Sequence, residues 1–277
     1  MTHFLESIAE YADLWSDGLR PVLAGLNLEK LTYHWPVVLA STLACSLIFT
    51  LSGILSPMLF PASFRNMKAF QRINWNIHVV SMVHCCLALY WSFPLINHPK
   101  LADDYINSYW PYFSNIAAVS CGYFLWDFVV SMRYIKQTGI GFAVHGLGSF
   151  AVFLLSFRPF INAYGPVFLM LELSTPFLNL HWFMDKLGMT GSLPQLVNGV
   201  ILLATFFGSR LVFGIYWAIH LYTNFYHNWD TVPHYLAISV VVSNMALNIL
   251  NFFWFSKMVS AIRGRFDQPD TLAHPIV

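Results

Sequence analysis

The sequence predicts an all-α fold, a polytopic transmembrane helical bundle of about seven spans. Three observations predict it: long apolar stretches that fill the chain, a low content of charged residues, and Pro or Gly residues between the stretches. Of the 277 residues, 57% are hydrophobic and only 10% are charged, whereas soluble domains carry about 25% charged residues. This composition excludes an ordinary cytosolic enzyme. The net charge of +1 does not indicate a nucleic-acid partner, because such proteins are usually strongly basic.

The apolar stretches have the length that a membrane demands. An α-helix rises about 1.5 Å per residue, so about 20 apolar residues cross the hydrocarbon core of a bilayer. The fourth stretch is short and contains Gly146 and Gly148, so for this stretch a full crossing and a partial one both stay open. The stretches cover residues 36–59, 77–96, 112–132, 141–157, 163–184, 196–219 and 235–255.

The sequence divides into four expected segments. We expect a lumenal or interfacial segment over residues 1–35, a first transmembrane helix over 36–61, a six-helix transmembrane domain over 62–264, and a cytosolic tail over 265–277. Within the first segment, apolar residues recur at helical spacing and predict a short amphipathic helix at the membrane surface. They are Leu5, Ile8, Leu14, Trp15 and Leu19.

Basic residues between the spans predict the orientation. With seven spans, nine Lys and Arg residues lie on one side of the membrane and four on the other. Because the cytosolic side carries the excess, we expect a cytosolic C-terminus and a lumenal N-terminus. The four cysteines all lie within apolar stretches, where they behave as small hydrophobic residues, and no spacing of His and Cys predicts a metal site.

Ionisable residues inside the spans are the candidate functional residues, because each is costly in hydrocarbon. Asp127 near the end of the third span and His145 near the start of the fourth have similar predicted depths. A carboxylate that orients an imidazole creates a general base or a nucleophile, so these two residues are the catalytic candidates. The alternative is that each is a buried group satisfied by helix packing.

A second pair is predicted near the middle of the bilayer. Glu172 and Arg210 lie at similar depth and form a candidate buried ion pair, with either a structural or a chemical role. With His84, Ser174 and Asn179 they form the candidate lipid-binding set, although hydrogen bonding between helices equally explains a histidine such as His84.

Small residues around His145 leave two interpretations open. Gly141, Gly146 and Gly148 would let either a neighbouring helix or a lipid chain approach the backbone closely. A groove beside His145 is therefore one expectation and tight helix packing is the other.

Several motifs carry a family resemblance. They are Trp75-Asn76, the sequence Y-F-L-W-D over residues 123–127, F-A-V-H-G-L-G-S over 142–149, and above all E-L-S-T-P-F-L-N-L-H-W-F over 172–183. Together they resemble the TLC domain family, which includes TRAM proteins, Lag1-type ceramide synthases and CLN8. The similarity is greatest to the branch of TLC domain-containing protein 4 (TLCD4) and covers roughly residues 62–264.

The resemblance implies a helical bundle of the endoplasmic reticulum or related membranes that handles fatty-acyl lipids or sphingolipids. In the ceramide synthases of the family, a pair of histidines supports acyl transfer from acyl-CoA. His145 matches the first histidine of that pair, and Gly146 stands in place of the second.

Three functions are weighed on these grounds. The first is a lipid-handling protein that binds acyl lipids or sphingolipids in its bundle, needs no cofactor and influences membrane lipid composition. The second is an acyltransferase that uses His145, with acyl-CoA as co-substrate. The third is a transporter or channel with the membrane charges lining a path, which the lack of visible sequence repeats disfavours.

Overall fold

The computed structural model describes residues 18–266, and these are built from helices without strands. In chain order the elements are α2 (Leu31–Leu59), α3 (Pro61–Asn66), α4 (Ala69–Ser92), η1 (Phe93–Leu95), α5 (Pro99–Ala102), α6 (Pro111–Arg133), α7 (Ile135–Thr138), α8 (Ile140–Leu155), α9 (Tyr164–Leu169), η2 (Met170–Ser174), α10 (Thr175–Lys186), α11 (Leu193–Phe206), η3 (Phe207–Phe213), α12 (Gly214–His227) and α13 (His234–Phe266). The predicted interfacial helix lies largely in residues 1–17 and most of the predicted tail in 267–277, outside the described residues.

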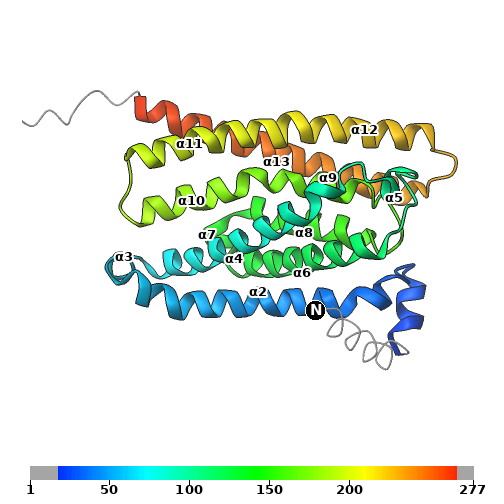
Figure 1. The fold of residues 1–277 in the computed structure, drawn as a ribbon, viewed down its shortest axis with the longest axis horizontal. Coiled ribbons are helices and arrows are strands. Elements are labelled where there is room, and N and C mark those ends of the chain that lie inside the picture. The colour runs from blue at the N-terminus through cyan, green and yellow to red at the C-terminus, as the bar shows by residue number, and fades with distance from the viewer. Residues whose placement is uncertain (1–17, 267–277) are drawn as a thin grey trace, which may run out of the picture.

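Long helices run side by side, and the chain passes back and forth between the two ends of the bundle (Figure 1). Five segments of the described chain are long and apolar enough to cross a membrane: Leu31–Leu59, Ala69–Leu95, Pro111–Arg133, Leu193–His227 and His234–Ala261. Helix α8 is apolar but shorter, at 16 residues, as the fourth stretch predicted. The predicted fold class, an all-α transmembrane bundle, is confirmed.

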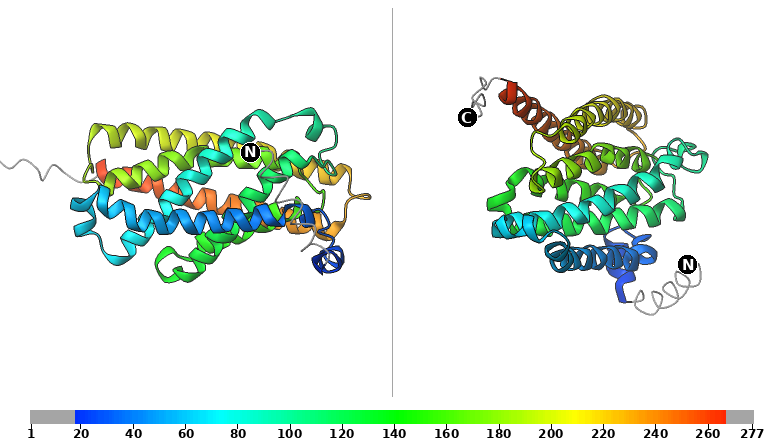
Figure 2. Two further views of the ribbon diagram at one scale, coloured as in Figure 1. Left: turned by 60° about the horizontal axis from the view of Figure 1, so that its bottom comes forward. Right: turned by 60° about the vertical axis from the view of Figure 1, so that its left-hand side comes forward.

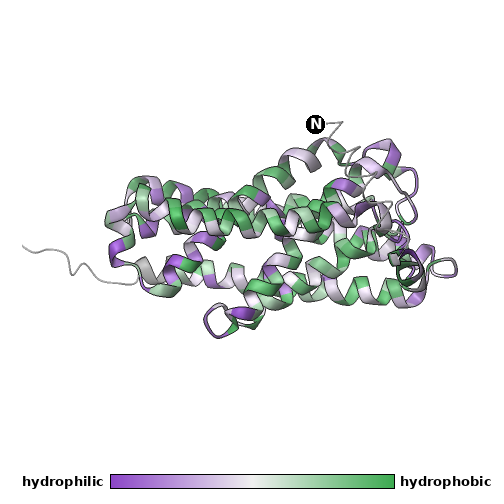
Figure 3. Ribbon diagram, turned by 90° about the horizontal axis from the view of Figure 1, so that it is seen from below, coloured by the Kyte–Doolittle hydropathy of each residue, from purple (hydrophilic) through white to green (hydrophobic). Residues whose placement is uncertain are grey.

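The outer surface of the bundle is apolar where lipid would meet it. On α2 a row of leucines, Leu39, Leu43, Leu47 and Leu51, is exposed. In water a row of this kind would be a large aggregation-prone patch, whereas hydrocarbon solvates it well. Hydrophilic residues gather towards the loops, and hydrophobic residues dominate the long helices (Figure 3). The protein is therefore an integral membrane protein.

The fifth predicted span is not one helix, which corrects the expectation for residues 163–184. It consists of α9, the 3₁₀ segment η2 and α10. Pro176 at the start of α10 has no N–H with which to bond the carbonyl of Glu172 in an α-helical pattern. Instead, the backbone N–H of Thr175 bonds the Glu172 carbonyl in the tighter pattern. This break places Glu172 and Ser174 on a distorted turn within the bundle.

The helices lie in layers. Helix α2 covers one side, α11, α12 and α13 form the opposite side, and α4, α6, α8 and α10 lie between them (Figures 1 and 2). Gly122 of α6 permits the close contact with α2, since a Cβ there would lie 2.4 Å from the Val38 carbonyl oxygen. The Ser41 hydroxyl donates to the Val119 carbonyl at 2.7 Å across the same contact. Helices α2 and α6 therefore pack backbone to backbone, as small residues allow in membranes.

Candidate functional site: a polar centre and an apolar groove

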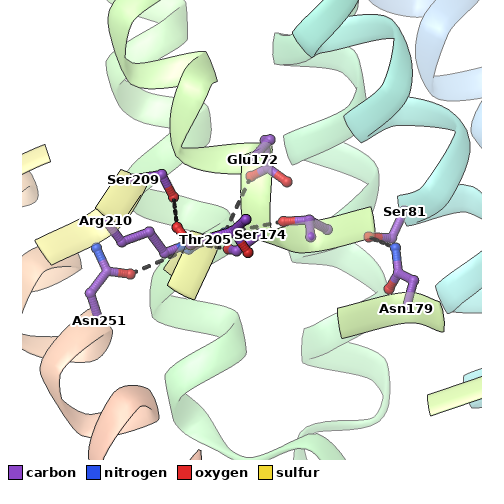
Figure 4. Close-up of polar contacts among 9 residues, drawn as sticks. Ser81, Glu172, Ser174, Asn179, Thr205, Ser209, Arg210 and Asn251 are labelled. Atoms are coloured by element: carbon purple, nitrogen blue, oxygen red, sulfur yellow. Dashed lines mark hydrogen bonds and ion pairs between the residues drawn. The ribbon is translucent and has the colours of Figure 1, made fainter. Parts of the chain in front are cut away.

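Five polar side chains meet inside the bundle and form what we call the polar centre: Glu172, Ser174, Thr175, Arg210 and Asn251. They come from η2, the first residue of α10, η3 and α13. Four different elements thus converge on one guanidinium (Figure 4).

Irregular backbone places Arg210 at this point. Helix α11 continues into α12 through the π-helical segment η3, and Arg210 lies in its middle. A π-helical turn widens the helix and changes the direction of the side chains that follow, and such turns occur frequently at functional sites. Ser209 donates its hydroxyl to the Thr205 carbonyl at 2.7 Å, which adds a side-chain bond where the backbone pattern changes.

Each nitrogen of the Arg210 guanidinium has an acceptor. Nε donates to Ser174 Oγ at 3.1 Å, Nη2 to Thr175 Oγ1 at 3.2 Å and Nη1 to Asn251 Oδ1 at 3.3 Å. Glu172 supplies the counter-charge, with Oε1 at 3.8 Å from Nη2. Arg210 is only 7% exposed and Glu172 only 8%, so the predicted buried ion pair is present.

Energetics explain why this pair is closely surrounded by polar groups. Removing one partner of a buried ion pair typically costs about 3–5 kcal/mol, because the remaining charge has no compensation. Three neutral oxygens and one carboxylate satisfy Arg210 without a ligand. The polar groups of the centre therefore satisfy one another within the bundle as it stands.

Asn179, a predicted lipid-binding residue, lies one turn further along α10 and faces α4. Its Nδ2 donates to Ser81 Oγ at 3.1 Å, and its Oδ1 lies 2.7 Å from His78 Nδ1. Asn179 is fully buried and joins α10 to α4 (Figure 4). Its contacts are those of a hydrogen bond between helices rather than of a ligand site.

The expected contact between Asp127 and His145 is absent among the described residues. No hydrogen bond or ion pair joins them, and the ring of His145 packs near Phe124 and Trp254, with centroids 6.2 Å and 5.6 Å away. The reason is rotational. Gly146 faces α6 so closely that a Cβ there would lie 2.9 Å from the Cα of Phe128, and the preceding residue of a helix points about 100° away.

The same glycine decides between the two interpretations of the small residues. At Gly146 the neighbour is α6, and at Gly141 and Gly148 it is Leu250 and Leu247 of α13. These glycines therefore serve helix packing, and the groove expected beside His145 is not formed by them. Asp127 interacts electrostatically with Glu172, and His145 with Arg210. Besides the predicted pair of Glu172 and Arg210, the polar centre thus has two further interactions that sequence did not predict.

The structure forms an apolar groove in a different place, on the α2 side of α6. Its volume is about 280 Å³, and α2, α4 and α6 line it. Its wall holds Ala40, Ser41, Ala44 and Cys45 of α2, all of them small. Ala40 and Ala44 are exposed, so the groove opens towards the surrounding lipid.

His84 is the polar residue of this groove. It is 4% exposed, its ring stacks on Tyr123 with centroids 3.7 Å apart and planes at 8°, and Nε2 lies 3.4 Å from Ser120 Oγ. Its Nδ1 is buried and has no hydrogen-bond partner within the described chain. Leaving such a group unpaired typically costs about 1–3 kcal/mol.

Sequence reasoning placed His84 in the candidate set but missed the α2 half of the groove. The available signal was the recurrence of small residues at positions 40, 41, 44 and 45, which share one face of a helix. The family resemblance begins only after α2, so it did not indicate that this face of α2 belongs to a site.

The fold and these sites define an integral membrane protein, an all-α bundle with an ionic centre. Comparison with known proteins then gives the family. The model of the TLC domain, shared by TRAM, LAG1 and CLN8, matches residues 74–260, and the chain belongs to this TLC domain family, which is related to membrane lipids.

Individual relatives agree with this assignment. The chain is similar to an uncharacterised TLC domain-containing protein of Schizosaccharomyces pombe, with 36% identity over 89% of this chain and 85% of that protein. It is 33% identical to topoisomerase I damage affected protein 4 of Saccharomyces cerevisiae over 68% of this chain and 69% of that protein. It is 26% identical to human TLC domain-containing protein 4 over 70% of this chain and 76% of that protein, in keeping with the branch that the sequence motifs indicated.

Proposed function

We propose that this protein binds a membrane lipid in the groove between α2, α4 and α6 and thereby influences the lipid composition of its membrane. The observation that carries the proposal is the groove itself, an apolar space of about 280 Å³ with exposed alanines at its edge. The groove lies just below the lower bound of about 300 Å³ for ligand pockets of proteins, so we propose a ligand part no larger than one acyl chain or one compact ring system. Membership of a lipid-related family supports the same conclusion.

The position of the groove supports entry from the bilayer. Helix α2 lies at the periphery, and Val83 and Leu87 of α4 are 39% and 37% exposed beside the groove. A hydrocarbon chain can therefore reach the groove sideways without crossing a polar surface. Such a route requires no opening to water.

Extraction of bound lipid tests the proposal. The wild type and Ala44→Trp, which fills the groove from its edge, are purified in the same detergent, and lipids that copurify are identified by mass spectrometry. We expect about one lipid per wild-type protein and a several-fold smaller amount with Ala44→Trp. Leu43→Trp on the neighbouring exposed face of α2 is the matched control and should retain the lipid. Equal lipid content in all three proteins would contradict the proposal.

The structure favours binding over acyl transfer. His145 lacks the carboxylate partner that would orient a general base, and its ring is packed against Trp254. If His145 is not the catalyst, any rate of acyl transfer from acyl-CoA to a sphingoid base should be unchanged in His145→Ala. Incubation of the purified protein with labelled acyl-CoA and sphingoid base measures that rate directly.

For the setting, we propose the endoplasmic reticulum or a related endomembrane with the C-terminus in the cytosol. The basic residues support this orientation: Arg65, Lys68, Arg72, Arg133 and Lys186 all lie at the end of the bundle to which α13 also runs. Protease protection of a tag after residue 277 in sealed vesicles tests it.

A further inference from the structure

We infer that one end of the bundle binds the phosphorylated headgroup of an anionic phospholipid, whose acyl chains stay in the surrounding bilayer. The binding surface, which we call the basic rim, consists of five exposed cations: Arg65, Lys68, Arg72, Arg133 and Lys136. The rim shares no residue with the lining of the lipid groove. The inference therefore goes beyond the proposed function and does not depend on it.

The basic rim is formed by two turns that are distant in sequence and adjacent in space. One turn leads from α3 into α4, and the other leads from α6 into α7. Phe70 of the first turn contacts Tyr134 of the second, with ring centroids 5.9 Å apart. Each of these aromatic residues has two cations of the rim within two positions in sequence. A single headgroup beside this aromatic contact can thus meet cations from both turns.

The two ends of the bundle differ in their charge balance. At the end that carries the rim, the described side chains include seven cations but one carboxylate, that of Asp185, which already pairs with Lys186 at 2.7 Å. At the opposite end, four described cations accompany four described carboxylates. The cations there are Arg20, Lys30, Lys100 and Arg158, and the carboxylates are Glu29, Asp103, Asp104 and Asp230.

Membrane orientation explains the basic residues of the rim but not the lack of carboxylates around them. Orientation depends on Lys and Arg near the span ends, and Asp and Glu contribute little to it. Acidic residues could therefore balance the rim without changing the orientation. Yet residues 31–102 and 128–171, which contain the whole rim, include no Asp or Glu. The charge of the rim is thus left for an external anion.

The contacts of the rim hold its cations in place without neutralising them. Arg72 donates Nε–H to the Met67 carbonyl at 3.2 Å, and the Arg133 guanidinium lies over the Tyr134 ring at 5.7 Å. Within the described chain no carboxylate pairs with any of the five cations. A guanidinium that keeps its outer nitrogens exposed can bond a phosphate with two parallel hydrogen bonds.

The position of the rim favours a lipid over a soluble anion. The apolar spans Ala69–Leu95 and Pro111–Arg133 begin and end at the rim. Val129 and Met132, just before Arg133, are 55% and 47% exposed, so the surface meant for hydrocarbon starts within about one helical turn of the cations. Lipid phosphates lie at this boundary, where basic clusters attract anionic headgroups.

The number of cations favours a headgroup with more than one negative charge. A phosphate monoester carries about −1.5 to −2 charges at pH 7 and presents three acceptor oxygens. The phosphate of phosphatidylcholine is instead balanced by the ammonium of its own headgroup. Phosphatidic acid and phosphorylated inositol lipids share the monoester chemistry, and we use phosphatidic acid as the probe.

Native mass spectrometry of the full-length protein in detergent tests the inference. Phosphatidic acid, phosphatidylserine and phosphatidylcholine with identical acyl chains are titrated at low ionic strength. We expect phosphatidic acid to bind at least about tenfold more tightly than phosphatidylcholine and several-fold more tightly than phosphatidylserine. Equal affinity for phosphatidic acid and either of the other two lipids would overturn the inference.

A soluble competitor separates a lipid from a free phosphate. Glycerol 3-phosphate is the headgroup of phosphatidic acid without its acyl chains, and at equal concentration it should leave the lipid bound. If it displaces the lipid, the rim recognises a soluble phosphate, and the assignment to a phospholipid is overturned.

A matched pair of double variants locates the binding. Lys68→Gln/Lys136→Gln removes one exposed cation from each turn, and we expect the affinity for phosphatidic acid to fall about ten- to thirtyfold. Lys100→Gln/Arg158→Gln removes two cations at the opposite end and should keep the affinity of the wild type. Size-exclusion profiles establish that both proteins are folded. An unchanged affinity of the rim variant, or an equal loss in both variants, would overturn the inference.

Ala44→Trp separates the rim from the groove. This variant fills the groove and should keep the preference for phosphatidic acid over phosphatidylcholine. Loss of that preference in Ala44→Trp would place the phosphatidic acid in the groove and overturn the rim. A preference that persists while the groove lipid is lost supports the rim as a second lipid site.

Discussion

The polar centre and the groove lie on different sides of the bundle and differ in how their polar atoms are satisfied. In the polar centre, every nitrogen of the Arg210 guanidinium has an acceptor within 3.3 Å, and Glu172 balances its charge. In the groove, His84 retains a buried nitrogen without a partner in the described chain. The polar centre is therefore satisfied by the protein itself, whereas the groove presents an apolar wall to the surrounding lipid.

Breaking the ion pair should give the largest effect. Arg210→Met leaves Glu172 buried without a cation, and we expect a loss of about 3–5 kcal/mol in stability. Thermal unfolding in a fixed detergent, followed by size-exclusion chromatography, measures it as a large fall in melting temperature.

The double variant Arg210→Met/Glu172→Gln is the control for charge. Because it removes both charges together, most of the lost stability should return. A double variant no more stable than Arg210→Met would show that the polar centre stabilises through its hydrogen bonds rather than through its charge balance.

Displacing α2 should have the next largest effect, and it acts on the groove. In Gly122→Ala the new Cβ would lie 2.4 Å from the Val38 carbonyl oxygen, so α2 has to move away from α6. We expect a loss of about 1–3 kcal/mol, the usual cost of overpacking, together with reduced lipid copurification.

Gly148→Ala is the matched control for that substitution. Its Cβ would meet only the side chain of Leu247, at 3.6 Å, so stability and lipid content should both stay near wild type. Equal behaviour of the two variants would show that the contact between α2 and α6 does not shape the groove.

Removing a hydrogen bond outside both sites should matter less. Asn179→Leu breaks the link from α10 to His78 and Ser81 of α4, and a bond of this kind in a membrane bundle contributes about 1 kcal/mol. We expect a small fall in melting temperature with unchanged lipid binding. A loss of lipid without a loss of stability would instead return Asn179 to the set of ligand-binding residues that sequence had proposed.

The two regions also differ in how far sequence could predict them. The lengths of the apolar stretches predicted the bundle, because bilayer thickness dictates helix length. Depth along the helices predicted that Glu172 and Arg210 would meet, and they do. Depth also predicted that Asp127 and His145 would meet. That contact depends on the rotation of each helix about its axis as well. Because Gly146 packs against α6, the adjacent His145 side chain points in another direction and does not bond Asp127.

The groove could not be predicted for a related reason. It exists because α2, α4 and α6 meet at particular rotations, and nothing in the apolar pattern of α2 distinguishes its faces strongly. The π-helical turn at Arg210 was likewise not predicted, although Gly208 and Ser209 lie within it, because the apolar pattern runs through this segment without a break. Sequence therefore reports the positions of groups along the membrane normal better than their positions around each helix.

His84→Phe should give the smallest change in stability, and with the opposite sign. The substitution removes the buried Nδ1, which has no partner in the described chain, together with Nε2 and its 3.4 Å contact with Ser120 Oγ, and it retains the ring that stacks on Tyr123. In delipidated protein we expect stability to stay level or rise by up to about 1 kcal/mol, since removal of an unpaired polar group relieves its desolvation penalty. Lipid added back should stabilise the wild type and the variant by similar amounts, because the groove wall that contacts the lipid is apolar in both. Thermal unfolding with and without added diacylglycerol measures both effects. A destabilisation of the delipidated variant clearly larger than that of Ser120→Ala would mean that Nδ1 also has a structural partner, and the contrast between the polar centre and the groove would then be lost.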